Sequence, residues 1–110
     1  MKFAVYQIDP EKDKEHVRFE SYENTIAWAE KIDPSIYRKV WESEIDPCGY
    51  FNMDRLLEEV FWMLNVGEKP EGYTGWSLSV SDVIVTDVWA YFVDDVGFKR
   101  FPAKGFPSVE

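Results

Sequence analysis

The sequence predicts an α+β fold: a small, mostly antiparallel sheet of four or five strands with two helices packed on one face. Alternating apolar runs near both ends of the chain indicate strands, and two stretches between them have the apolar spacing of helices. Aromatic residues make up 17% of the composition, which is enough to build a core. A chain of 110 residues buries most of its apolar surface in one core, so a single domain over residues 1–110 is expected.

The first half of the chain is expected to contain two strands and a helix. Residues 2–8 alternate and are rich in β-forming residues, which predicts the first strand. Ser21 is a suitable N-cap for a helix that runs to about residue 32, because the residue before Pro34 leaves the helical region. Residues 37–44 fit a helix only loosely, and their β-branched and aromatic content favours a strand.

The second half begins with the clearest helix, over residues 53–65, with Asn52 as its N-cap. Its apolar stripe, broadened by Trp62, predicts that much of the helix is covered. Residues 75–85 and 90–98 are alternating runs around a short turn, which predicts a β-hairpin at the centre of the sheet. A loosely held tail is expected from about residue 102.

The charge is strongly acidic, with a formal net charge of -9. Such a surface repels nucleic acid and anionic membranes and attracts basic protein surfaces, although solubility alone also explains it. No apolar run is long enough to cross a bilayer, and the apolar start of the chain is too short for a signal peptide. One cysteine, Cys48, cannot form an internal disulfide, and a cytoplasmic protein is therefore expected.

Residues for catalysis or cofactor binding are sparse. The chain has one histidine, His16, one cysteine and no glycine-rich phosphate-binding motif, so no catalytic residue and no cofactor are assigned. Asp82, Asp94 and Asp95 are acids that a hard cation such as magnesium accepts. Their spacing matches no known ligand loop, which favours turn-capping roles and predicts no metal site.

The last third of the chain carries a motif of its own, a Gly-x-Ser-Leu-Ser-x-Ser-Asp-Val stretch followed by Tyr-x-Val-Asp and Gly-Phe. The residues in these places are Gly75, Ser77, Leu78, Ser79, Ser81, Asp82, Val83, Tyr91, Val93, Asp94, Gly97 and Phe98. This pattern resembles the signature of the YodL-like family, small bacterial proteins often found on mobile genetic elements. The resemblance implies a mobile-element or host-accessory setting and no particular reaction.

Turn chemistry accounts for the signature residues Ser79, Ser81, Asp82, Asp94 and Gly97. Short polar side chains accept hydrogen bonds from backbone N–H groups at turns, and Gly97 can supply a positive φ. These residues are therefore expected to matter for folding and not for chemistry.

Five tryptophans exceed what one small core needs, and tryptophan is enriched at interface hot spots. The predicted partner surface contains Trp89, Trp41 and Trp76 with the acidic residues Glu42, Glu44, Glu58 and Glu59. Trp89 ends the expected hairpin tip 87–89, where it is either exposed or folded back onto the sheet. Lys99-Arg100 is a small basic spot that suits an edge strand better than direct nucleic-acid binding.

These observations favour a non-enzymatic inhibitor that binds a host protein with a basic surface. A CRISPR effector nuclease or a restriction enzyme is the expected partner, because acidic side chains can occupy a groove made for phosphates. The alternative is an accessory regulator that binds a cytoskeletal or signalling protein through an aromatic surface. An enzyme ranks third, for want of a catalytic constellation.

Overall fold

The structure, a computed structural model, describes residues 2–44, 52–66, 68–86 and 89–106. Within these residues one antiparallel sheet has the strand order β2-β1-β3-β4-β5. Its strands are β1 (Lys2–Ile8), β2 (Tyr37–Glu44), β3 (Val83–Val85), β4 (Trp89–Val93) and β5 (Phe98–Pro102). The helices are α1 (Tyr22–Ala29) and α2 (Met53–Asn65), with 3-10 turns η1 (Pro10–Lys12) and η2 (Pro34–Ile36). The predicted α+β class and the strand count are confirmed.

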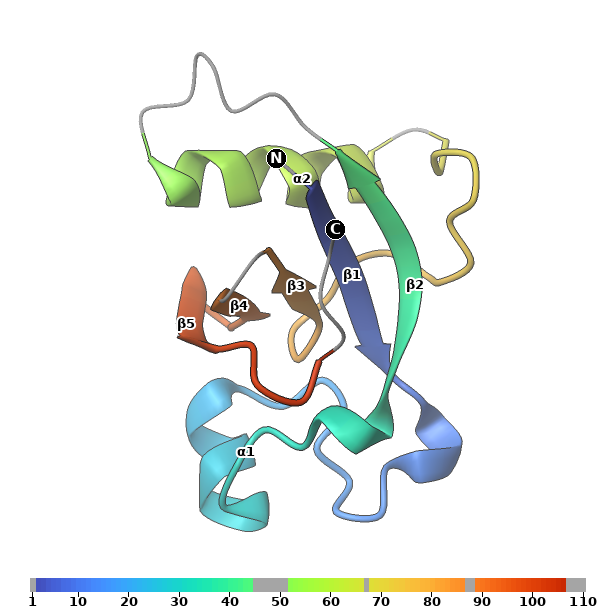
Figure 1. Cartoon of the computed structure of the whole chain (residues 1–110). Helices are drawn as coiled ribbons and strands as arrows, with labels where there is room; N and C mark the ends of the chain where they lie inside the picture. Colours follow the sequence, from blue (N-terminus) through green and yellow to red (C-terminus); the bar gives the residue numbers. More distant parts are fainter. Residues whose placement is uncertain (1, 45–51, 67, 87–88, 107–110) are drawn as a thin grey trace.

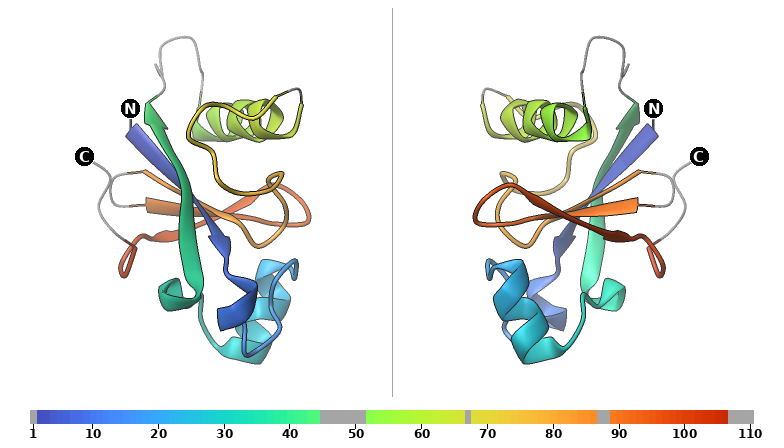
Figure 2. Two further views of the ribbon diagram at one scale, coloured as in Figure 1. Left: turned by 90° about the vertical axis from the view of Figure 1, so that its right-hand side faces the viewer. Right: turned by 90° about the vertical axis from the view of Figure 1, so that its left-hand side faces the viewer.

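The two helices lie on opposite sides of the sheet, so the expectation that both pack on one face is wrong. On β1, Ala4 and Tyr6 belong to the core cluster on the α1 side, whereas Phe3 and Val5 belong to the cluster on the α2 side. Figures 1 and 2 show the strands between α2 and α1. The inner strands are apolar on both faces, and each face needs its own cover.

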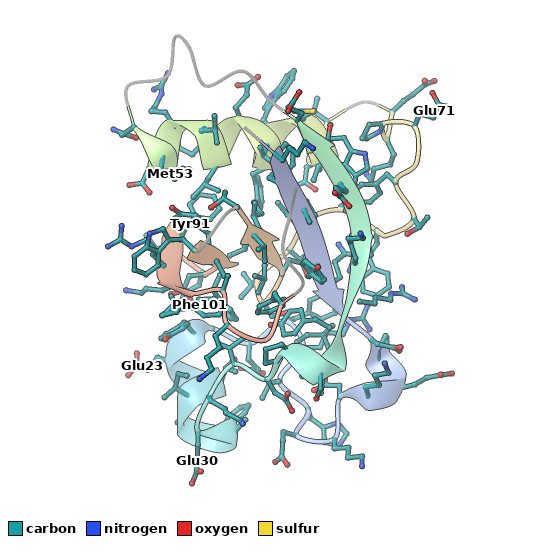
Figure 3. The ribbon with its side chains drawn as sticks, viewed as in Figure 1. Glu23, Glu30, Met53, Glu71, Tyr91 and Phe101 are labelled. Atoms are coloured by element: carbon teal, nitrogen blue, oxygen red, sulfur yellow. The ribbon has the colours of Figure 1, made fainter. Side chains whose placement is uncertain are left out.

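Helix α2 begins and ends where the sequence predicts. The Asn52 side chain accepts a hydrogen bond from Arg55 N at 3.0 Å. Leu57, Val60 and Leu64 pack on the sheet, and Figure 3 shows Tyr91 of β4 beneath the Met53 end of the helix. Phe61 and Trp62, however, are 37% and 58% exposed. The predicted broad covering of this helix is wrong, because one stripe fills the contact with the sheet and the rest faces solvent.

Helix α1 is shorter than predicted. Ser21 caps its start, accepting from Asn24 N, but the helix ends at Ala29. Glu30 takes a left-handed conformation with φ of 69° and donates its backbone N–H to Ile26 O. Pro34 begins η2 and does not terminate the helix. The helix therefore ends at a local C-cap. The sequence did not predict it, because this position usually holds glycine and here holds Glu30.

The predicted strand over residues 75–85 is confirmed only at Val83–Val85. The preceding residues form a loop that crosses β1 and β2 on the α2 side. A Cβ atom at Gly75 would overlap the Gln7 side chain and lie 2.9 Å from Val40 Cβ. Val40 is the extra residue of a bulge in β2, since Val5 pairs with Trp41 and Tyr6 pairs with Lys39. The loop lies too close to the sheet at this point for any residue larger than glycine.

The chain after β5 is held to the core through Phe106. Ala103 and Phe106 are buried, and the Phe106 ring lies edge-on to Tyr6 and Tyr37, with centroids 5.1 and 5.5 Å apart. The tail expected to be loosely held from residue 102 is thus packed as far as residue 106. Cys48, the expected tip residues Asp87 and Val88, and residues 107–110 lie outside the described residues.

We expect Gly97→Val to lower the free energy of unfolding by about 1–2 kcal/mol, measured by urea denaturation. Gly97 has a φ of 71°, which a β-branched residue adopts only under strain, although a Cβ there would meet no atom within 4 Å. Val96→Ala, at a side chain that is 85% exposed, is the matched control and should change little. Equal stability of the two variants would contradict this expectation.

Candidate protein-binding surface

The predicted partner-surface residues do not gather in one place. Trp41 is buried, with its ring edge-on to Phe3 at a centroid distance of 5.4 Å. It belongs to the core on the α2 side, and its assignment to a partner surface is corrected. The bulge at Val40 explains this, because Val40 and the following Trp41 both lie in that cluster.

Trp76 and Trp89 are partly exposed, and arginines of the same chain lie over their rings. The guanidinium carbons of Arg18 and Arg38 are 4.2 and 5.0 Å from the Trp76 ring. Trp89, the first residue of β4, is 37% exposed, with the Arg100 guanidinium 4.2 Å from its ring. Of the two expectations for Trp89, the structure shows a ring at the surface that Arg100 covers on one side.

The four predicted glutamates are exposed but divided between two sides of the sheet. Glu42 pairs with Ala4 across the strands and therefore shares its side, the α1 side. Glu58 and Glu59 lie on α2, on the other side. Lys39 and Glu42 form the only ion pair found among the described residues, at 2.8 Å, which lowers the pKa of Glu42.

Trp62 is a candidate for binding a partner, although the sequence pattern predicted that it would be covered with the rest of α2. It lies one helical turn beyond Glu58 and Glu59, at i+4 and i+3, and Asp54 precedes Glu58 by four residues. Residues at these spacings share one side of a helix. We call Asp54, Glu58, Glu59, Phe61 and Trp62 the α2 outer face; all five are exposed. A helical projection could have found Trp62, since it falls in the acidic row and outside the apolar stripe.

A groove of about 260 Å³ runs beside the α2 outer face. Glu58 and Phe61 line it from the helix, and the β4–β5 turn supplies the rest. The turn residues are Val93, Asp94, Asp95, Gly97 and Phe98. This α2 groove combines carboxylates with aromatic rings, a combination that suits a cationic group.

The signature residue Asp82 lies in a buried hydrogen-bond network with Gln7. Its Oδ2 accepts from Gln7 Nε2 at 3.0 Å and from Ser79 N at 2.8 Å. The Gln7 amide also bonds both backbone groups of Trp76, donating to O at 3.0 Å and accepting from N at 3.2 Å. Burial raises the pKa of Asp82 to about 7, against the lowering effect of these bonds.

The other signature residues connect α1 and its preceding segment to the sheet. The Ser81 hydroxyl accepts from Phe19 N at 2.9 Å, and Ser81 O accepts from the Tyr37 hydroxyl at 2.7 Å. Asp94 Oδ1 accepts from Tyr22 N, the first residue of α1, at 3.0 Å. These are contacts of turns and caps, which stabilise the fold.

In the parts of the chain that the structure describes, no three His, Cys, Asp or Glu side chains come together as a metal site would require. Neither described helix has both the length and the apolar character that crossing a membrane demands. His16 is exposed, and Cys48 lies in the undescribed stretch after β2.

The fold and this surface define a small two-sided α+β domain with an acidic, aromatic helix on one side. A family model described as the YodL-like domain matches residues 2–103, and the chain belongs to the YodL-like family. Neither a curated protein nor a solved structure matches the chain.

The raised pKa of Asp82 predicts a specific pH dependence of stability. The folded chain holds this proton up to about pH 7, whereas the unfolded chain releases it near its ordinary pKa of about 3.9. Between these values the folded state binds more protons, so the contribution of Asp82 to stability falls as the pH rises. Asp82→Asn can keep both hydrogen bonds through one amide oxygen and removes the titration.

The melting temperature of Asp82→Asn, relative to wild type, should therefore rise between about pH 5 and about pH 8. Differential scanning calorimetry at several pH values measures this difference. Asp95→Asn, at an exposed position, is the control for a general charge effect. A difference that stays constant with pH would show that Asp82 does not titrate in this range.

The two tryptophans should respond oppositely to truncation. Trp41→Ala removes a buried ring and should cost about 3–5 kcal/mol of unfolding free energy. Trp89→Ala removes a ring at the sheet margin and should cost much less, because solvent and Arg100 already cover part of it. Urea denaturation of both variants tests this, and a similar loss for both would place Trp89 in the core.

Proposed function

We propose that this chain is a non-enzymatic module that binds a host protein with a basic surface, and that the α2 outer face is the contact. The observation that carries this proposal is the exposure of Trp62, at 58%, in a helical row with Asp54 and Glu58. An exposed tryptophan is a strong potential hot spot, and carboxylates around it steer a basic partner toward it.

Charge supports the choice of partner. The net charge is -9, and within the described residues only Glu42 has a cationic side chain at ion-pair distance. The remaining exposed carboxylates are therefore not neutralised by ion pairs within the described residues, and their negative charge can attract a basic partner. A surface of this kind competes with phosphates for a positively charged groove, and salt weakens the association.

The partner class that fits best is a nucleic-acid-binding host defence enzyme, a CRISPR effector nuclease or a restriction enzyme, inhibited by a protein encoded on a mobile element. The chain belongs to the YodL-like family, and a mobile-element origin is part of the proposal. The inhibitor would place its carboxylates where the enzyme holds phosphates and Trp62 in an adjoining apolar pocket. The site of action is then the cytoplasm of the host cell.

A second candidate is an accessory regulator of a cytoskeletal or signalling protein. The observation in its favour is Trp28 on α1, which is 54% exposed and lies across the sheet from the α2 outer face. A partner bound through Trp28 would depend little on salt, because apolar contacts are not screened.

The test is DNA cleavage by a guide-loaded CRISPR effector nuclease and by a restriction enzyme, measured at increasing concentrations of this chain. We expect inhibition that weakens steeply with salt and is relieved when DNA is bound first. Trp62→Ala should weaken binding by about 2 kcal/mol or more, close to thirtyfold in Kd. Inhibition that does not change with salt concentration and is unchanged in the Trp62→Ala variant would overturn this mechanism.

A matched pair of charge reversals locates the surface. Glu58→Lys with Glu59→Lys changes the α2 outer face, whereas Glu42→Lys with Glu44→Lys changes the exposed β2 edge on the α1 side. We expect the first pair to reduce the association rate much more than the second, measured by stopped-flow or surface plasmon resonance. Equal effects of the two pairs on the association rate would indicate that the net charge of the whole protein attracts the partner, and not a surface centred on α2.

A further inference from the structure

We infer that the α2 groove receives an arginine side chain from a basic segment of the partner. This inference rests on the proposed function, since it names the group that the acidic surface recognises. Its components are the acidic residues Glu58, Asp94 and Asp95 and the aromatic residues Phe61 and Phe98, which line one groove.

Phe19, Trp76 and Trp89, elsewhere at the surface, already have an arginine over their rings. Arginine guanidinium groups lie 4.2–4.3 Å from the rings of Phe19 and Trp89, and two arginines lie over Trp76. In the described residues no such group lies over Phe61 or Phe98. The rings of the α2 groove thus lack the cation that Phe19, Trp76 and Trp89 hold.

Hydrogen bonds orient the carboxylates at the β4–β5 turn and leave one oxygen of each without a partner in the described residues. Asp94 Oδ1 accepts from Tyr22 N and Asp95 N, and Asp95 Oδ1 accepts from Val96 N. The Oδ2 atom of each has no hydrogen-bond partner within the described residues. Backbone bonds on one oxygen fix each carboxylate, which leaves the second oxygen free to accept from a guanidinium.

Size and shape favour a single arginine side chain over a larger ligand. The groove volume of about 260 Å³ lies below the ~300–1,000 Å³ typical of small-molecule sites. A guanidinium is planar, stacks on aromatic rings and donates to two carboxylates at once, whereas an ammonium group is a compact point charge. The groove offers both rings and carboxylates, so it should prefer arginine to lysine.

The probe is a blocked tripeptide, acetyl-Gly-Arg-Gly-amide, titrated into the ¹⁵N-labelled protein. Its controls are the same peptide with lysine or with citrulline, the neutral analogue of arginine, at the centre. We expect saturable shifts at Glu58, Phe61, Asp95 and Gly97, in the order arginine, then lysine, then citrulline. Asp95→Asn and Glu58→Gln should each weaken arginine binding about two- to fivefold.

Asp95→Asn keeps an acceptor for Val96 N, so it tests charge without removing the turn contact. Glu44→Gln, on the other side of the sheet, is the matched control and should leave binding unchanged. Citrulline binding as strong as arginine binding, or shifts confined to other surfaces, would overturn the inference.

The two proposals fail separately. If Glu58 and Glu59 reversals relieve inhibition of a defence enzyme while the arginine peptide leaves the groove unshifted, the groove assignment is wrong and the function stands. If the peptide binds the groove but neither enzyme is inhibited, the partner class is wrong and arginine recognition stands.

Discussion

The buried hydrogen bond between Gln7 and Asp82 is the contact on which the rest of the structure depends. It joins the end of β1 to the loop before β3, across 75 residues of sequence. The same amide bonds both backbone groups of Trp76, and the neighbouring Ser81 accepts from Phe19 N and Tyr37. Without this pair, the buried Gln7 amide and the buried Asp82 carboxyl would each lose one of their hydrogen bonds, which is costly in an apolar environment. This buried hydrogen-bond network thus connects the central strands to the loop before β3 and to the segment before α1.

The two-sided sheet determines what the surface can offer. Because β1, β3 and β4 are apolar on both faces, α1 and α2 each cover a different face and cannot pack against each other. Helix α2 then buries a single stripe, and its opposite side is free to carry Glu58, Glu59 and Trp62. The acidic, aromatic surface is a consequence of this layering, since a helix packed between the sheet and a second helix would have buried its tryptophan.

Within the described residues, the distribution of arginines divides the surface aromatics into two groups. Trp76, Trp89 and Phe19 have guanidinium groups over their rings, and these contacts are internal to the domain. Phe61, Trp62 and Trp28 have none, and Phe61 and Trp62 stand among carboxylates that a partner can reach. A ring already paired with a cation gains little from a second one, whereas a bare ring beside carboxylates gains both stacking and charge. This difference is why the proposed binding surface is centred on α2 and not on Trp76 or Trp89.

The sequence by itself determined the elements that depend on neighbouring residues. Local propensity and hydrogen bonds within a few residues explain these elements. They are the strands at 2–8 and 37–44, the helix at 53–65, the caps Ser21 and Asn52 and the positive φ of Gly97. Only the tertiary structure decided which helix covers which face, that residues 75–82 form a loop, that Trp41 is buried and that Trp62 is exposed. It alone revealed Gln7, whose partners lie up to 75 residues away. Each of these outcomes depends on contacts between distant segments, and such contacts leave no periodic trace in the sequence.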